Sequence, residues 1–175
     1  MTLAWIALLP FLGALAPALT IRLGRNACAL ATGLVSATAL GLLLSLAPQV
    51  MAGEVVTARL DWFPALGLNL NFFLDALGLM FAGMILGIGL LVIIYARFYL
   101  AKADPMGRFF AFLLLFQGAM VGIVLSDNIL LLLIFWELTS LSSFLLIGYW
   151  RHLPEGRQGA RMALTVTGLG GLSLI

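Results

Sequence analysis

Long apolar runs separated by short polar connections make up most of this 175-residue chain. The runs lie at 3–21, 27–47, 73–96, 109–125 and 129–150, and another begins near Met162 and is still apolar at Ile175. A helix needs about 20 apolar residues to cross a hydrocarbon core of about 30 Å. Helix is expected for each run, because an open strand in lipid leaves backbone groups without hydrogen bonds. The pattern predicts an all-α polytopic membrane bundle with about six transmembrane helices.

The composition excludes the common soluble classes. Hydrophobic residues make up 63% of the chain and charged residues 9%, whereas soluble domains are about half apolar and about a quarter charged. Disorder requires the opposite balance. A net charge of +2 gives no reason to expect a nucleic-acid partner. Because the last run is still apolar where the sequence stops, we expect residues 1–175 to be the N-terminal transmembrane bundle of a longer polypeptide.

The basic residues predict the orientation in the membrane. All but one of the nine lysines and arginines lie in the connections after the first, third and fifth runs, and Arg59 is the exception. Cytoplasmic loops carry the excess of positive charge. We therefore expect a multi-pass protein of the cell (inner) membrane, with its N-terminus outside.

One outer connection is long, running from about Pro48 to Phe72. Apolar and asparagine residues alternate at its end, from Leu68 to Phe72, and β-branched residues are frequent near its start. With Pro64 and Gly67 between them, these segments are typical of a short β-hairpin. A plain extended loop fits the same residues equally well.

Glu137 is the acidic residue that lies deep within an apolar run. It comes eight residues after Ile129, which is about 12 Å along a helix. A charged side chain near the bilayer centre costs at least about 2.5–3.5 kcal/mol and usually faces protein or water. We interpret Glu137 as a titrating group on a proton or ion path. A neutral glutamic acid hydrogen-bonded to a neighbouring helix is the structural alternative.

The charge state of Glu137 depends on whether a positively charged side chain lies near it in the membrane. No lysine or arginine lies at the same depth in residues 1–175. Burial favours the neutral form of a carboxyl group. Glu137 is therefore either protonated much of the time or paired with a cation from elsewhere.

Polar residues follow Glu137 closely, and Thr139, Ser140 and Ser143 are candidates for a supporting polar path. Ser140 is three residues after Glu137, a spacing that brings two side chains to one face of a helix. Taken singly, each hydroxyl is also explained by close helix packing.

Four further residues are weaker candidates. We expect Gln117 to form an interhelical hydrogen bond, and Asp75 to cap a helix or lie at the membrane interface. Asp127 fits a helix N-cap better than a cation ligand. His152 at the inner boundary has the right chemistry to pass protons, although a solvated histidine explains it as well.

The remaining patterns indicate packing. Gly83-x-x-x-Gly87 and Gly118-x-x-x-Gly122 are typical of closely approaching membrane helices. The sequence contains no phosphate loop and no paired metal-ligand motif, so we expect no cofactor and leave a metal site open.

Part of the sequence is similar to a known family. The stretch 135–157, FWELTSLSSFLLIGYWRHLPEGR, resembles the large antiporter-like A subunit of Mrp-type multisubunit Na⁺/H⁺ antiporters, and 71–95 and 107–151 share the likeness. The same superfamily supplies the proton-pumping membrane subunits of NADH:quinone oxidoreductase. The resemblance implies that Glu137 matches the family's membrane-embedded glutamate, which pairs with a lysine of a later helix. It also implies an outer β-hairpin.

Three functions follow as hypotheses. The first is membership of a multisubunit monovalent cation (Na⁺)/H⁺ antiporter, with other membrane subunits as partners and protons and Na⁺ or another monovalent cation as the transported ions. The second is a proton-pumping membrane subunit of a respiratory or hydrogenase complex. The third is a structural membrane scaffold that transports no ions. The first two are transporters in mechanism, and only the second is linked to an enzyme.

Overall fold

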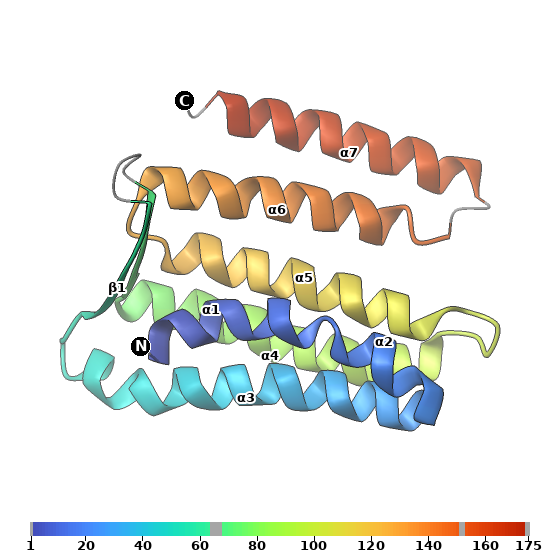
Figure 1. Ribbon diagram of the computed structural model, residues 1–175, viewed down its shortest axis with the longest axis horizontal. Coiled ribbons are helices and arrows are strands. Elements are labelled where there is room, and N and C mark those ends of the chain that lie inside the picture. Colours follow the sequence, from blue (N-terminus) through green and yellow to red (C-terminus); the bar gives the residue numbers. More distant parts are fainter. Residues whose placement is uncertain (1, 64–67, 151–152, 174–175) are drawn as a thin grey trace.

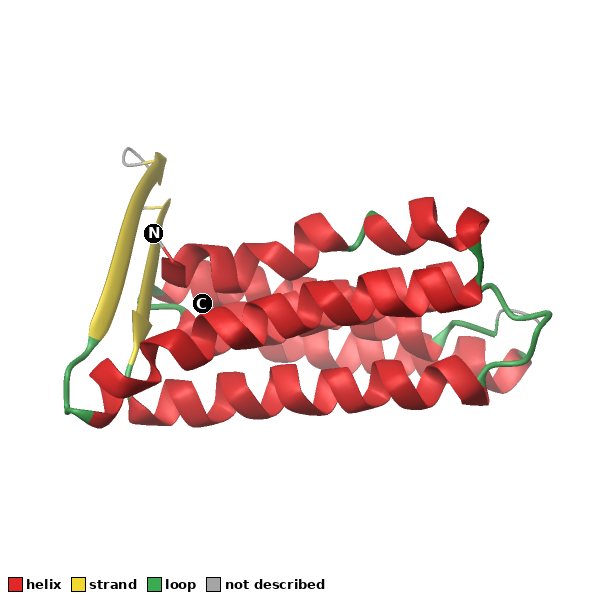
Figure 2. Cartoon of the chain, turned by 90° about the horizontal axis from the view of Figure 1, so that it is seen from below, coloured by secondary structure: helices red, strands yellow, loops and turns green. Residues whose placement is uncertain are grey.

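The computed structural model describes residues 2–63, 68–150 and 153–173. Helices dominate these ranges, and a two-stranded hairpin lies across one end of the helix bundle (Figures 1 and 2). The elements in chain order are α1 (Thr2–Gly13), α2 (Ala16–Thr20), the 3₁₀ turn η1 (Ile21–Leu23), α3 (Arg25–Met51), β1 (Val56–Phe63), β2 (Leu68–Leu74), α4 (Ala76–Tyr99), α5 (Met106–Leu125), α6 (Ile129–Ile147) and α7 (Pro154–Leu172).

Five helical segments of the described chain are long and apolar enough to cross a membrane. They are Thr2–Leu23, which joins α1, α2 and η1, and the helices α3, α4, α5 and α6. These confirm the membrane bundle expected from the apolar runs. The sixth expected span falls within α7, which packs beside α6 and is not among the five. The count of six therefore stays a prediction.

Several predicted helix ends were wrong by a few residues. The helix expected to start at Phe73 starts at Ala76, because Phe73 and Leu74 belong to β2. The helix expected to reach Trp150 ends at Ile147. The run near Met162 belongs to a helix that begins at Pro154. Proline suits the first turn of a helix, where its missing N–H costs nothing, so α7 starts in its charged segment before the apolar one.

Two glycines set the ends of α3. Gly24 precedes the helix with φ of +120°, and Gly53 follows it with φ of +89°. Such angles are unfavourable for other residues. The sequence prediction stopped the helix at Ala47, before Pro48, but the helix continues to Met51. Proline lacks a backbone N–H but keeps its carbonyl as an acceptor. The carbonyl of Pro48 accepts a hydrogen bond from the N–H of Ala52, so the last turn of the helix still forms around it.

The outer connection forms the β-hairpin that the alternating pattern predicted. β1 and β2 pair antiparallel, with Val56 opposite Leu74 and Arg59 opposite Asn71. Leu70 packs against the core, and Phe72 and Leu74 are buried in it, so the alternate residues do turn inward. Pro64 and Gly67 lie outside the described residues.

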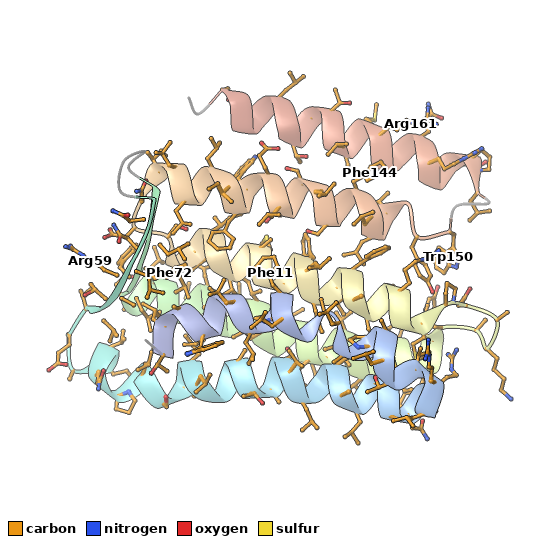
Figure 3. The ribbon with its side chains drawn as sticks, viewed as in Figure 1. Phe11, Arg59, Phe72, Phe144, Trp150 and Arg161 are labelled. Carbon is orange, nitrogen blue, oxygen red and sulfur yellow. The ribbon has the colours of Figure 1, made fainter. Side chains whose placement is uncertain are left out.

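Connections alternate between the two ends of the bundle. The N-terminus, the hairpin and the α5–α6 turn lie at one end, called here the hairpin end (Figure 1). The connections α2–α3, α4–α5 and α6–α7 lie at the other, called here the basic end because most of the arginines gather there. Figure 3 shows Arg59 at the hairpin end, and Arg161 and Trp150 toward the basic end. The sequence-based division of charge thus agrees with the fold, and which end faces the cytoplasm stays a prediction.

The core consists of two apolar clusters. One, near the hairpin end, joins α1, α3 to α6 and the hairpin. There the rings of Phe11 and Phe72 lie 6.1 Å and 6.2 Å from that of Phe135 (Figure 3 labels the first two). The second cluster lies at the basic end and includes Cys28, Phe110 and Tyr149.

Among the described residues, one of the two predicted glycine faces is closely packed against a neighbouring helix. A Cβ added at Gly118 would lie 2.8 Å from Phe11, and one at Gly122 would overlap the Phe135 ring. A Cβ at Gly83 would meet Leu43 at 3.9 Å, and one at Gly87 would meet nothing within 4 Å. Within the described residues no helix packs closely on Gly83 or Gly87, so the expectation for this pair stays a prediction.

Candidate functional site

Glu137 lies on α6, which packs between α5 and α7 (Figure 1). Its side chain is exposed, and its Oε1 occupies the space that a Cβ of residue 171 would need. Glycine at 171 therefore leaves room for the carboxyl group beside α7. Within the described ranges Glu137 forms neither an ion pair nor a hydrogen bond.

Trp136 holds α7 next to this carboxyl group. Its indole Nε1 donates a hydrogen bond of 3.1 Å to the carbonyl of Thr167. A Cβ at Gly171 would lie 2.9 Å from the same indole ring, and one at Gly170 would lie 3.9 Å from it. Small residues let membrane helices approach closely. The tryptophan and the glycines of α7 therefore fix the surroundings of Glu137.

The hydroxyl groups after Glu137 bond to their own helix. Thr139 donates to the carbonyl of Phe135 over 2.9 Å, and Ser140 donates to that of Trp136 over 3.1 Å. Ser140 is buried whereas Glu137 is exposed, so their surroundings differ despite the three-residue spacing. Ser143 is half-buried. A hydroxyl group that donates its hydrogen can still accept a hydrogen bond through its oxygen lone pairs. The polar path through these residues stays a prediction.

Gln117 is buried at the junction of three helices. Its Nε2 donates to Ser36 Oγ of α3 over 2.8 Å and to the carbonyls of Ile85 and Leu86 of α4 over 3.3 Å. A Cβ at Gly89 would overlap the amide, so this glycine makes room for it. The predicted interhelical hydrogen bond is present.

The two aspartates near helix starts behave differently. Asp75 caps α4, where its Oδ1 accepts a hydrogen bond of 2.7 Å from Gly78 N–H. Asp127 is exposed and does not cap α6, so that expectation was wrong. Asn128 takes the position instead and accepts 2.9 Å from Leu130 N–H. The asparagine is one residue nearer to the helix, and Asp127 donates its own N–H to the carbonyl of Asn71 in the hairpin.

His152 lies outside the described residues, but the neighbouring basic end shows a cluster that sequence reasoning missed. Arg108 Nη2 donates to the carbonyl of Tyr149 over 3.0 Å, and its Cζ lies 5.3 Å from the centre of the Tyr149 ring. Burial raises the pKa of the Tyr149 phenol, with Asp104 adding to the rise. The signal was available, because Arg108 starts one helix and Tyr149 follows the antiparallel helix beside it.

Among the residues that the structure describes, no group of three or more histidine, cysteine, aspartate or glutamate residues comes together. The structure therefore adds no metal ligands to those considered from sequence.

Two family profiles match the chain. Residues 62–110 match the family described as NADH-ubiquinone oxidoreductase (complex I), chain 5 N-terminus. Residues 126–175 match the family described as NADH:quinone oxidoreductase/Mrp antiporter, TM, and this stretch includes Glu137. The chain belongs to the family of antiporter-like membrane subunits common to these two kinds of complex.

Within that family, the chain resembles the A subunit of Mrp-type antiporters. It is 47% identical over 167 residues, 95% of its length, to the probable K⁺/H⁺ antiporter A/B subunit of Rhizobium meliloti. It is 49% identical over 133 residues, 76% of its length, to the A1 subunit of the Na⁺/H⁺ antiporter of Staphylococcus aureus. The chain spans 17% of the length of each of these relatives.

Two solved structures share the fold. A chain of the Mrp complex from Dietzia sp. DQ12-45-1b matches with a TM-score of 0.83 and 36% identity, covering 99% of this chain and 18% of that one. A chain of the membrane-bound sulfane sulfur reductase, an archaeal respiratory membrane complex, also has a TM-score of 0.83, at 21% identity, covering 99% and 26%. The second likeness concerns the fold alone.

Proposed function

We propose that this chain acts within a multisubunit antiporter that exchanges a monovalent cation for protons across the cell membrane, and that Glu137 carries the proton. The observation that supports the proposal most is the likeness to the antiporter relatives, which is 47% identity over 95% of the chain for the Rhizobium protein. The relatives are named for different cations, K⁺ and Na⁺. We therefore propose the class of monovalent alkali cations.

The position of Glu137 suits this role. A carboxylate at mid-membrane depth is costly against lipid and is retained where it meets protein or water. Glu137 is exposed on the bundle formed by these residues, so its missing contacts belong to further polypeptide or to partner subunits. A lysine of a later helix is the partner that the family resemblance implies.

The proposed mechanism is a shift in protonation. When a cationic side chain moves near Glu137, the charged form is favoured and the proton leaves. When the cation moves away, Glu137 takes up a proton from the other side. Thr139, Ser140 and Ser143 would supply hydroxyl groups along the route, and the coupled cation would move when the neighbouring cationic group does.

The test is transport in everted membrane vesicles that contain the assembled complex. Respiration sets up a pH gradient, and a pH-sensitive dye reports its collapse when NaCl or KCl is added. We expect Glu137→Gln to abolish the exchange and Glu137→Asp to retain part of it. Glu155→Gln is the matched control, because it makes the same change at an exposed carboxylate in the first turn of α7. Undiminished exchange in Glu137→Gln vesicles, at equal expression, refutes the proposal.

A second candidate is a role in a redox-driven proton pump. The complex I description of the profile matched at 62–110 favours it. Purification of the intact assembly separates the two functions. Iron–sulfur and flavin subunits in the purified assembly support the pump, and small membrane subunits alone support the antiporter. A scaffold without transport requires Glu137→Gln to be neutral for both assembly and transport.

A further inference from the structure

A groove of about 590 Å³ runs between α3 and α4 on the outside of the bundle. Its walls are apolar and include Ala29, Gly33 and Ala37 from α3, with Leu90 and Ile94 from α4. Gly33 lines the groove, and the space beside it is open, since a Cβ added there would meet nothing within 4 Å. The groove therefore lies on the outer side of the membrane-spanning bundle that the described residues form.

The groove has the length of one leaflet. Its lining extends along α3 from Asn26 to Ala37, which is about 16 Å at the helical rise. The hydrocarbon core is about 30 Å thick. An acyl chain of a lipid extends through about half of that thickness, which matches the length of the groove. The length therefore favours a lipid of the leaflet at the basic end.

Positive charge gathers at the mouth of the groove. Arg97 and Asn26 line it, and Arg97 donates from Nε to Asn26 Oδ1 over 2.6 Å. The adjacent Arg25 donates to the carbonyls of Leu100 and Ala101 over 2.7 and 2.9 Å. In the part of the chain that the structure describes, neither arginine forms an ion pair.

The nearby acid Asp104 leaves these arginines available to a ligand. Its carboxylate is directed elsewhere, accepting from the Ala101 N–H and from the Trp150 indole. Each guanidinium has five N–H donors, and two of them are used on Asn26 for Arg97 and two on carbonyls for Arg25. The remaining donors are complementary to a phosphate group.

Aromatic side chains mark the level of the lipid headgroups at this mouth. Tyr95 and Tyr99 are exposed on α4, with ring centres 5.1 Å apart, and Phe98 is 80% exposed beside the Arg97 guanidinium. Tyrosine is enriched at the boundary between hydrocarbon and water. The arginines therefore stand at the depth of phosphate groups, and the apolar walls extend from there into the membrane.

We propose that this groove is a binding site for an anionic phospholipid, with one acyl chain along α3 and α4 and the phosphate at Arg97 and Asn26. Basic pockets between membrane helices recognise anionic headgroups in this way. The site is separate from Glu137 and does not depend on the proposed transport function.

Lipid binding is measured by native mass spectrometry of the intact membrane assembly in detergent, with phosphatidylglycerol and phosphatidylcholine added separately. We expect phosphatidylglycerol to bind more tightly. Arg97→Gln should weaken its binding about fivefold or more, and Lys102→Gln, an exposed basic residue of the same end that does not line the groove, should change it much less.

A steric pair of variants tests the acyl part of the site without changing charge. Gly33→Leu fills the groove and should reduce phosphatidylglycerol binding as strongly as Arg97→Gln does. Gly41→Leu is its matched control on α3, because that glycine is equally open and lies outside the groove. Each variant is compared with wild type for assembly of the complex, so that misfolding is separated from loss of binding.

Four results would overturn the proposal. The first is equal affinity for the two lipids. The second is unchanged phosphatidylglycerol binding in both Arg97→Gln and Gly33→Leu. The third is loss of a partner protein from Gly33→Leu with lipid binding retained, which would assign the groove to a protein helix. The fourth is displacement of the lipid by soluble glycerol phosphate at equal concentration, which would show that the apolar walls contribute nothing.

Discussion

The amide of Gln117 and the hydroxyl of Ser36 form a hydrogen bond of 2.8 Å between α5 and α3, buried from solvent and flanked by two carbonyls of α4. Polar contacts of this kind join helices that have no hydrophobic drive to associate in lipid. Three helices of the bundle thus meet at one side chain.

Removal of either partner should weaken the bundle. Gln117→Met and Ser36→Ala should each lower the free energy of unfolding by about 0.6–1.7 kcal/mol, and the double variant should lose less than the sum. Unfolding in detergent by dodecyl sulfate, followed by circular dichroism, measures this. Ser45→Ala is the control, because that exposed serine donates only to the carbonyl of Leu42 in its own helix. Strict additivity would show that the contact contributes no coupling energy.

The start of α6 offers a direct comparison of two adjacent residues. Asn128→Ala should lower the free energy of unfolding by about 1 kcal/mol, since it removes the side chain that accepts from Leu130 N–H. Asp127→Ala should change it by less than about 0.5 kcal/mol, because that exposed side chain does not cap the helix. The same denaturation experiment measures both variants, and the reverse order would restore the aspartate as the cap.

Gly171 controls the space around Glu137. A Cβ at 171 would overlap Glu137 Oε1 and would lie 2.9 Å from the Trp136 indole, so both side chains must shift. Gly171→Ala should therefore reduce cation/proton exchange by roughly tenfold or more, because misplacement of a reacting group is costly. The amount of assembled complex is compared with wild type, so that weaker packing of α7 is separated from loss of transport. Gly168→Ala is the control, since a Cβ there meets nothing within 4 Å. Equal transport rates in the two variants would show that the position of the carboxyl group does not matter.

Tyr149 should make the folded protein sensitive to high pH. Its pKa is raised by burial, so above the ordinary value near 10 the folded state retains a phenol proton that the unfolded state loses. The stabilisation is fully present below about pH 10 and is lost as the pH rises through the folded pKa. Ultraviolet difference spectra of wild type and Tyr149→Phe identify the transition. The variant should lack it, and an unchanged transition would assign it to another tyrosine.

Apolar runs predicted the helices of the bundle well, because burial in lipid requires a continuous apolar segment. Helix ends were harder to predict, because turn residues such as proline and glycine determine them and the apolar pattern does not. Pro154 starts α7 among charged residues, and Gly53 ends α3 beyond a proline. The hairpin followed from the alternation at Leu68–Phe72, which directs Leu70 and Phe72 inward.

Glu137 as the central residue of the site stays a prediction, and its contacts could not be read from the sequence. Glu137 stands out in the sequence because an acid in an apolar run is rare. That Gly171 faces it and that Trp136 binds α7 depend on how two helices dock. Likewise, Arg108 and Tyr149 are 41 residues apart and meet through the antiparallel packing of α5 and α6. The order of the helices brings these two ends together, but the sequence does not identify which side chains pair.

The hairpin ties together parts of the bundle that are distant in sequence. Asp127 N–H bonds to the carbonyl of Asn71 over 2.9 Å, and Phe72 pairs with Ser126. The start of α6 is thereby fastened to the strand that leads into α4. If α6 tilts so that the surroundings of Glu137 change, it pivots about this fastened end, and its displacement grows toward the opposite end of the helix. Stiffening or loosening the pairing of β1 and β2 should therefore change the rate of that movement.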